Sequence, residues 1–171
     1  MKQRGFTMVE LIVIMLIVGI MGVAVVSRMD SLRGFDEIGF RDQVRATLEY
    51  ARKSAVAGRR YVCVGVIAGN AGLVVTRDQS DPDITALAAV NCTFALNLPG
   101  TQANTIVAPA GIAFAGPAAA VIFDPLGRAG QAVPANDCTP SSTTQYCYSI
   151  QDAASPAPQI VFLERETGYV R

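Results

Sequence analysis

The chain has 171 residues, of which 51% are hydrophobic and 16% are charged, a size that accommodates one domain plus an appendage. The 14 basic and 14 acidic side chains give a formal net charge of zero, but residues 61–171 hold four arginines against eight carboxylates, a net charge of −4. A segment of that sign repels a phosphate backbone, so we expect no dedicated nucleic-acid surface.

The first predicted element is an apolar helix near the N-terminus. An unbroken run of sixteen apolar or glycine residues extends from Leu11 to Val26, and only Thr7 and Glu10 interrupt its extension back to Phe6. These 21 residues are about the length that crosses a bilayer as a helix. Two basic side chains in residues 1–5 predict a cytoplasmic N-terminus, with the rest of the chain on the other side of the membrane.

An ordinary secretory signal peptide would have a shorter apolar core, followed by a small-residue cleavage site. Here the run is followed by Ser-Arg-Met-Asp at 27–30, which offers no such site. The position of Glu10 also needs an explanation, because a carboxylate at the edge of an apolar stretch is costly to bury without a partner. One interpretation places it in the headgroup region; the other gives it a role in assembly.

The segment Arg-Gly-Phe-Thr-Met-Val-Glu-Leu at 4–11 resembles the class III signal of type IV prepilins and pseudopilins. The resemblance implies that a prepilin peptidase cuts between Gly5 and Phe6 and methylates the new amino group of Phe6. It also implies that Glu10 pairs with the N-terminal amine of a neighbouring subunit, which would fix one axial register because two buried opposite charges cost less together than apart. The implied partners are other pilin or pseudopilin subunits, the peptidase and an inner-membrane assembly platform.

One feature departs from that family. Many pilins have a proline near the end of the apolar stretch, where this chain reads Val-Val-Ser-Arg at 25–28. Gly19 and Gly22 would allow bending instead, or close packing between helices.

A second, amphipathic helical segment is predicted after the apolar run. Its apolar positions recur at steps of four, four, three and four, and Gly58 is a stop signal. The positions are Phe40, Val44, Leu48, Ala51 and Ala55. We expect this stripe to pack against a sheet of the same chain, with the charged side solvated or in contact with neighbouring subunits.

Beyond Gly58 the pattern changes to strands. Residues 60–67 and 72–77 are β-rich runs joined by Ala-Gly-Asn-Ala, which predicts a hairpin. Residues 78–110 are predicted to be mostly loops, 119–123 a strand closed by the turn at 124–127, and 128–158 irregular. A last strand is predicted at 159–163, followed by a turn at 164–168.

This order of elements matches the layout of pilins, and two C-terminal motifs narrow the resemblance. Phe-Asp-Pro-Leu-Gly at 123–127 and Glu-Thr-Gly-Tyr-Val at 166–170 are similar to the GspH/FimT group of minor pilins and pseudopilins, which includes minor subunits of mannose-sensitive haemagglutinin pili. The resemblance implies an α+β pilin fold, with a long N-terminal helix packed on an antiparallel β-rich head. The predicted segments are a leader at 1–5, a transmembrane and assembly helix at 6–27, an amphipathic helix at 28–58 and the head at 59–171.

Four cysteines lie beyond the apolar run, at wide and irregular spacing. An even number without a close pair, in a chain that lacks histidine, favours disulfides in an oxidising compartment over a metal site. Cys138 and Cys147 would close a short loop and form the pair that we expect. Cys63 and Cys92 would span the predicted hairpin, and this second pairing stays open because four cysteines allow three connectivities.

The predicted function is a structural subunit of a type IV pilus, in filament initiation or at the tip, and not an enzyme. Without histidine there is no Ser-His or Cys-His pair, and no phosphate-binding loop or other cofactor site is present in the sequence. The aspartates at 78, 81 and 83 would favour a calcium site, but they lack the glycine and distal glutamate of an EF-hand loop. We therefore expect no cofactor and no metal.

Two alternatives use the same construction. One is a type II secretion pseudopilin, which the sequence does not separate from a pilus subunit. The other is a DNA-capturing minor pilin that would use Arg165 and Arg171, against the negative balance of the head. In each case the chain would start as a single-pass inner-membrane protein with a periplasmic head, and end in a filament.

Overall fold

The computed structural model describes residues 7–79, 90–130, 145–153 and 155–171, and within its helix the side chains up to residue 21 and from residue 35 onward. One helix, α1, runs from Met8 to Gly58. Contacts divide the chain into two compact units, Met1–Phe35 and Asp36–Arg171, so the division falls within the helix.

The described part of the first unit is helical and apolar. From Met8 to Met21 every large hydrophobic side chain is at least 45% exposed, because nothing in the described chain covers it. Among the described residues, none of the helices combines the length and the apolar character that crossing a membrane requires. The membrane span at 6–27 therefore stays a prediction.

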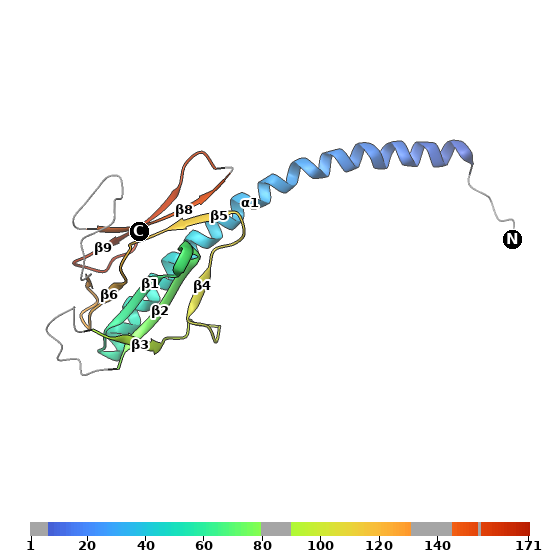
Figure 1. Cartoon of the computed structure of the whole chain (residues 1–171). Coiled ribbons are helices and arrows are strands. Elements are labelled where there is room, and N and C mark those ends of the chain that lie inside the picture. Colours follow the sequence, from blue (N-terminus) through green and yellow to red (C-terminus); the bar gives the residue numbers. More distant parts are fainter. Residues whose placement is uncertain (1–6, 80–89, 131–144, 154) are drawn as a thin grey trace. The chain divides into compact units, whose positions relative to one another are not determined.

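The second unit is an antiparallel α+β head (Figure 1). Its larger sheet has the order β3-β2-β1-β6-β7, with β4 also paired to β2. The smaller sheet has the order β5-β8-β9. The bounds of the strands are β1 Val62–Val66, β2 Gly72–Asp78, β3 Cys92–Ala95, β4 Thr105–Val107, β5 Ile112–Ala115, β6 Val121–Phe123, β7 Ala129–Gly130, β8 Gln145–Asp152 and β9 Gln159–Glu164.

The amphipathic stripe of α1 is the centre of the core. All five predicted positions, from Phe40 to Ala55, are at most 2% exposed, so the predicted stripe is confirmed. They form one cluster with the inward-facing side chains of both sheets, including Val64 and Val75 of the larger sheet and Tyr148 of the smaller one. The ring of Phe114 joins the layers, because it meets Phe40 edge-to-face at 5.5 Å and stacks on Tyr148 at 6.2 Å.

The predicted hairpin is confirmed as β1 and β2, which pair with Val64 opposite Val75. The connection is a short 3-10 turn, Ala68–Asn70, in which Gly69 and Asn70 have positive φ. Such angles are cheap for glycine and tolerated by asparagine, which explains why these residue types occupy the turn.

The prediction that 128–158 is irregular is wrong for its second half. β8 spans eight residues and lies between β5 and β9 in the smaller sheet. Its inward positions Tyr146, Tyr148 and Ile150 are fully buried, and polar residues or Cys147 alternate with them. Strand β5, which is rich in alanine, was also not predicted.

Candidate functional site

The first turn of α1 positions the acidic residue of the N-terminal motif. The backbone N–H of Glu10 donates to the hydroxyl of Thr7 at 3.4 Å, and the N–H of Leu11 donates to the Thr7 carbonyl at 3.3 Å. The Thr7 hydroxyl therefore satisfies the Glu10 N–H, a donor that a helix start leaves unpaired, while the bond to Leu11 is the first regular bond of the helix. The Thr-x-x-Glu spacing is typical of such starts. A carboxylate in the first turn also interacts favourably with the helix dipole.

Glu10 is exposed, and no ion pair joins it to any cation among the described residues. A negative charge thus stands at the start of an uncovered apolar surface, available to a cation from outside the described chain. Gly5 and Phe6, which the motif assigns to cleavage and methylation, lie outside the described residues.

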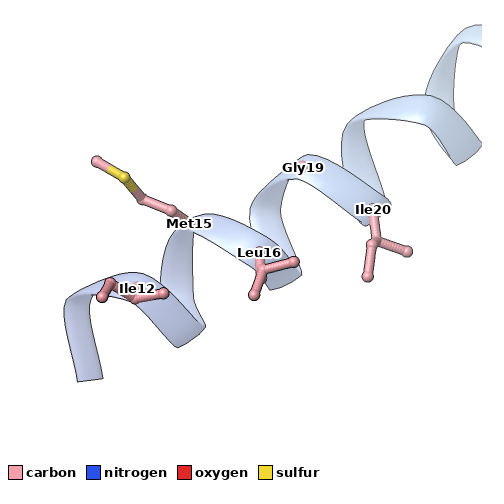
Figure 2. Close-up of a pocket in the computed structure, with 5 residues that line it drawn as sticks. All are labelled: Ile12, Met15, Leu16, Gly19 and Ile20. Atoms are coloured by element: carbon pink, nitrogen blue, oxygen red, sulfur yellow. The ribbon is translucent and has the colours of Figure 1, made fainter. Parts of the chain in front are cut away.

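The apolar surface beside Glu10 contains a shallow groove. It is lined by Ile12, Met15, Leu16, Gly19 and Ile20, which follow the spacing of one helix face (Figure 2). A side chain at Gly19 would meet no atom within 4 Å, so the groove is open at that point. A glycine on an apolar helix face lets another helix approach closely.

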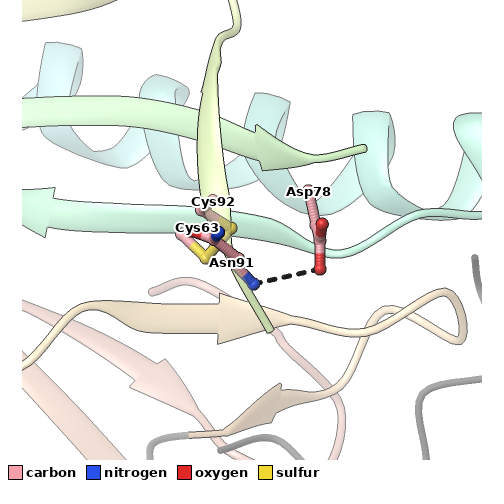
Figure 3. Close-up of a disulfide and its surroundings, with 4 residues drawn as sticks. All are labelled: Cys63, Asp78, Asn91 and Cys92. Atoms are coloured by element: carbon pink, nitrogen blue, oxygen red, sulfur yellow. Dashed lines mark hydrogen bonds between the residues drawn. A yellow bond between two sulfur atoms is a disulfide. The ribbon is translucent and has the colours of Figure 1, made fainter. Parts of the chain in front are cut away.

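A disulfide joins Cys63 of β1 to Cys92 of β3, with a Cα–Cα distance of 6.0 Å (Figure 3). Next to it the carboxylate of Asp78, which is only 2% exposed, accepts a hydrogen bond from the backbone N–H of Asn91 at 3.1 Å. Cys147 is disulfide-bonded as well, while Cys138 lies outside the described residues.

Of the three aspartates considered as calcium ligands, Asp78 is the one that lies among the described residues. Asp78 is used in the hydrogen bond beside the disulfide, and positions 81 and 83 lie outside the described residues. Within the described part of the chain, no three His, Cys, Asp or Glu residues are grouped as metal ligands would be.

The two C-terminal motifs meet at one arginine of α1, a contact that the sequence analysis missed. In the turn after β6, the Asp124 carboxylate accepts from the backbone N–H groups of Leu126 and Arg128 at 2.9 and 2.8 Å. The carbonyl of Gly127 then accepts from Nε of Arg52 at 3.3 Å. Gly168, in the turn after β9, packs so closely here that an added Cβ would overlap the same carbonyl oxygen.

The arginines of the DNA-binding alternative are held by aromatic rings. The guanidinium of Arg165 lies 5.5 Å from the ring centre of Tyr146, and that of Arg171 lies 5.4 Å from the ring centre of Phe162. Arg171 also approaches Glu164 at 3.9 Å. The carboxylate of Glu164 would therefore compete with a phosphate for Arg171, while the rings pack against the faces of the two guanidinium groups.

Comparison with known proteins agrees with both the motif and the fold. Residues 1–26 match the family described as the prokaryotic N-terminal methylation motif. Two crystal structures of the Pseudomonas aeruginosa PAO1 type IV minor pilin FimU have a similar fold. The first, in space group P21, superposes with a TM-score of 0.54 at 14% identity, over 81% of this chain and 89% of FimU. The second, in space group P65, has a TM-score of 0.50 at 14% identity, over 78% and 89%.

No curated protein matches the sequence. The chain thus combines an N-terminal methylation motif with the α+β fold of a pilin, and the predicted fold is confirmed. The predicted resemblance to the type IV pilin family, with a minor pilin as the similar structure, is confirmed as well.

Proposed function

We propose that this protein is a minor structural subunit of a type IV pilus, assembled through its N-terminal helix in filament initiation or at the tip. The observation that carries the proposal is the methylation motif at 1–26, joined to a head with the fold of a minor pilin. The motif belongs to subunits that are processed and then packed by their helices. The head has a self-contained core that needs no partner to cover it.

The proposed sequence of events starts in the inner membrane, with the leader 1–5 in the cytoplasm and the head in the periplasm. Prepilin peptidase cuts between Gly5 and Phe6 and methylates the Phe6 amine. The segment 6–27 then moves from lipid to the helices of sister subunits on the assembly platform. Lipid tails and apolar helix surfaces cover the exposed side chains equally well, so the exchange costs little.

Glu10 has the role of setting the axial register in this proposal. Its exposed carboxylate stands at the start of the apolar surface without an ion-pair partner among the described residues. When that surface is covered, an unpaired carboxylate becomes costly, and the N-terminal amine of a neighbouring subunit compensates it in one register. Residues 28–58 and 59–171 supply the amphipathic helix and the head.

Mass spectrometry of the mature protein tests the processing step. In cells that contain the peptidase, we expect a chain that begins at Phe6 and carries one additional methyl group. The Gly5→Arg variant should keep its leader. A wild-type chain that retains residues 1–5 in such cells would contradict the proposal.

Incorporation into filaments tests the assembly step. Glu10→Ala should be processed normally and accumulate in the membrane, but it should be lost from sheared filaments. Glu49→Ala, which removes a carboxylate from the exposed side of the same helix, is the matched control and should assemble. Equal incorporation of Glu10→Ala and wild type would refute the register role.

A further inference from the structure

Three exposed apolar side chains come from the place where the two C-terminal turns meet the end of α1. They are Val56, Leu126 and Tyr169, which are 45%, 74% and 54% exposed. An added Cβ at Gly127 would lie 3.0 Å from a methyl group of Val56, and one at Gly168 would overlap the carbonyl oxygen of Gly127. Leu126 and Tyr169 directly adjoin these two glycines, so all three side chains start from segments of backbone that touch.

The fold does not require apolar side chains at the two turn positions. In the turn after β6, the Asp124 carboxylate and the positive φ of Gly127 shape the backbone, and Leu126 contributes its N–H as a donor at 2.9 Å. Any residue except proline supplies such a donor. Tyr169 likewise bonds through its backbone, at both its N–H and its carbonyl. Single exposed apolar residues are common, but neighbouring ones from distant parts of a sequence are typical of a contact surface.

The backbone beneath these side chains is held in place without a partner. Nε of Arg52 donates to the carbonyl of Gly127 at 3.3 Å, and the N–H of Gly168 donates to a carbonyl four residues earlier at 2.9 Å. A surface that is already ordered loses little conformational entropy on binding. Phe94 of β3, also 45% exposed, differs because the guanidinium carbon of Arg77 lies 4.7 Å from its ring centre and covers part of the ring.

Positive charge next to the three apolar side chains is not balanced within the described structure. Arg59 is exposed, and its backbone N–H donates to the last turn of α1 at 3.4 Å. Among the described residues, no ion pair joins Arg59 or Arg52 to a carboxylate. In the two turns, Asp124 is paired with Arg128 at 2.7 Å, and Glu166 is exposed. The unpaired charges here are thus two positive and one negative, on a head whose residues 61–171 have a net charge of −4.

We propose that Val56, Leu126, Tyr169 and Arg59 form a docking surface for another subunit of the proposed filament, one that presents an apolar side chain beside an Asp or Glu. The apolar side chain would cover the three exposed ones, and the carboxylate would pair with Arg59. Tyrosine and arginine are the residue types that contribute most at protein interfaces, and a basic partner segment would be repelled. The inference rests on the proposed function, since it takes the partner from the same filament, but it does not involve the N-terminal helix.

Photo-crosslinking of filaments tests the docking surface. Benzoylphenylalanine is placed at position 126 or, as the matched control, at position 107. Val107 is a 63% exposed residue of β4, a strand that β2 and β1 separate from β6. Sheared filaments are irradiated, and the cross-linked peptides are identified by mass spectrometry. We expect the probe at 126 to join one other filament subunit, at a peptide with an Asp or Glu beside an apolar residue, and the probe at 107 to give no such adduct.

The charge is tested by Arg59→Glu in the chain that carries the probe at 126. This variant should lower the yield of the adduct about fivefold, the upper range for an exposed charge pair. Arg45→Glu is the control, because Arg45 is exposed and paired with Glu49 within the same helix, and it should leave the yield unchanged.

Three results would overturn the inference. They are filaments that contain the chain but give no adduct at 126, an adduct there with a second copy of the chain or with a peptide that lacks a carboxylate, and a yield unchanged in Arg59→Glu. The peptide joined at 126 decides the matter by itself if that variant does not fold. Absence of the wild-type chain from the filaments would instead refute the proposed function, and this inference with it.

Discussion

A substitution at Gly168 tests how much the close packing of the two C-terminal motifs contributes to the stability of the head. Its φ of +61° is a conformation that side chains rarely adopt, and an added Cβ would overlap the backbone carbonyl oxygen of Gly127. In Gly168→Ala the carbonyl must move, and its hydrogen bond from Arg52 is lost. Loss of a hydrogen bond to a charged group costs about 1.5–3 kcal/mol, in addition to about 1 kcal/mol for the backbone conformation.

Gly100 provides the matched control. Its φ is +76°, also in the left-handed region, but an added Cβ would meet nothing within 4 Å. Gly100→Ala therefore has only the conformational cost of about 1 kcal/mol. We expect Gly168→Ala to reduce the free energy of unfolding by about 1.5–3 kcal/mol more than Gly100→Ala does.

The assay is urea unfolding of both full-length variants in detergent, followed by the near-ultraviolet circular dichroism of the buried tyrosines. The difference between the two glycines isolates the contact, because the conformational cost is common to both. Equal destabilisation within about 0.5 kcal/mol would show that the turns meet without the close packing at Arg52, and would refute the reasoning.

Three further predictions concern the core. Leu48→Ala should cost about 2–5 kcal/mol in urea unfolding, and Val56→Ala, at a position 45% exposed, less than about 0.5 kcal/mol. Removing the Cys63–Cys92 disulfide by double substitution to serine should cost about 3–4 kcal/mol in the same assay, because it closes a loop with a separation of 29 residues. Burial, and secondarily the nearby Tyr146 hydroxyl, raises the pKa of Tyr148 above its ordinary value of 10.0. An unfolded tyrosine ionises above that pH while the folded one keeps its proton, so stability should fall as pH rises past 10, and less steeply in Tyr148→Phe.

The elements predicted well are those whose pattern is local. The stripe from Phe40 to Ala55 is read from spacing alone, because a helix places residues three and four apart on one face. The β1–β2 hairpin is likewise local, since its turn residues lie between the two apolar runs. The end of α1 at Gly58 follows from a stop signal within the helix itself.

Strand β8 was missed because its signal is not local. Tyr146, Tyr148 and Ile150 alternate inward, but a Cys and a Ser separate them and a run of Ser, Thr and Gln precedes them. The strand is stabilised by pairing with β9 and with β5, from Ala115 opposite Ser149 to Ile112 opposite Asp152. Such pairing depends on tertiary context, which short-range propensity does not contain.

The residues of the candidate site also fall into two groups, those that a local motif predicts and those that depend on tertiary contacts. The roles proposed for Gly5, Phe6 and Glu10 follow from contiguous residues, so the motif alone predicts them. The hydrogen bond of Arg52 to a turn 75 residues away was not predicted, because no local pattern relates the helix to that turn. The stacking of Arg77 on Phe94 was not predicted either. To predict it, one would need the register of β2 with β3, which includes an irregularity between Arg77 and Asp78.

The two parts of α1, one in each unit of the chain, differ in what stabilises them. Phe40 to Ala55 are buried by the head itself, so substitutions there should change the folding of an isolated subunit. Leu16 is 61% exposed, like its apolar neighbours from Met8 to Met21, and soluble monomers rarely leave so large a contiguous apolar surface uncovered. Replacing Leu16 by alanine should thus leave the unfolding of the head unchanged and act only where lipid or another helix covers that surface. A helix that is stabilised internally in one unit and externally in the other can change its surroundings at one end without disturbing the fold at the other.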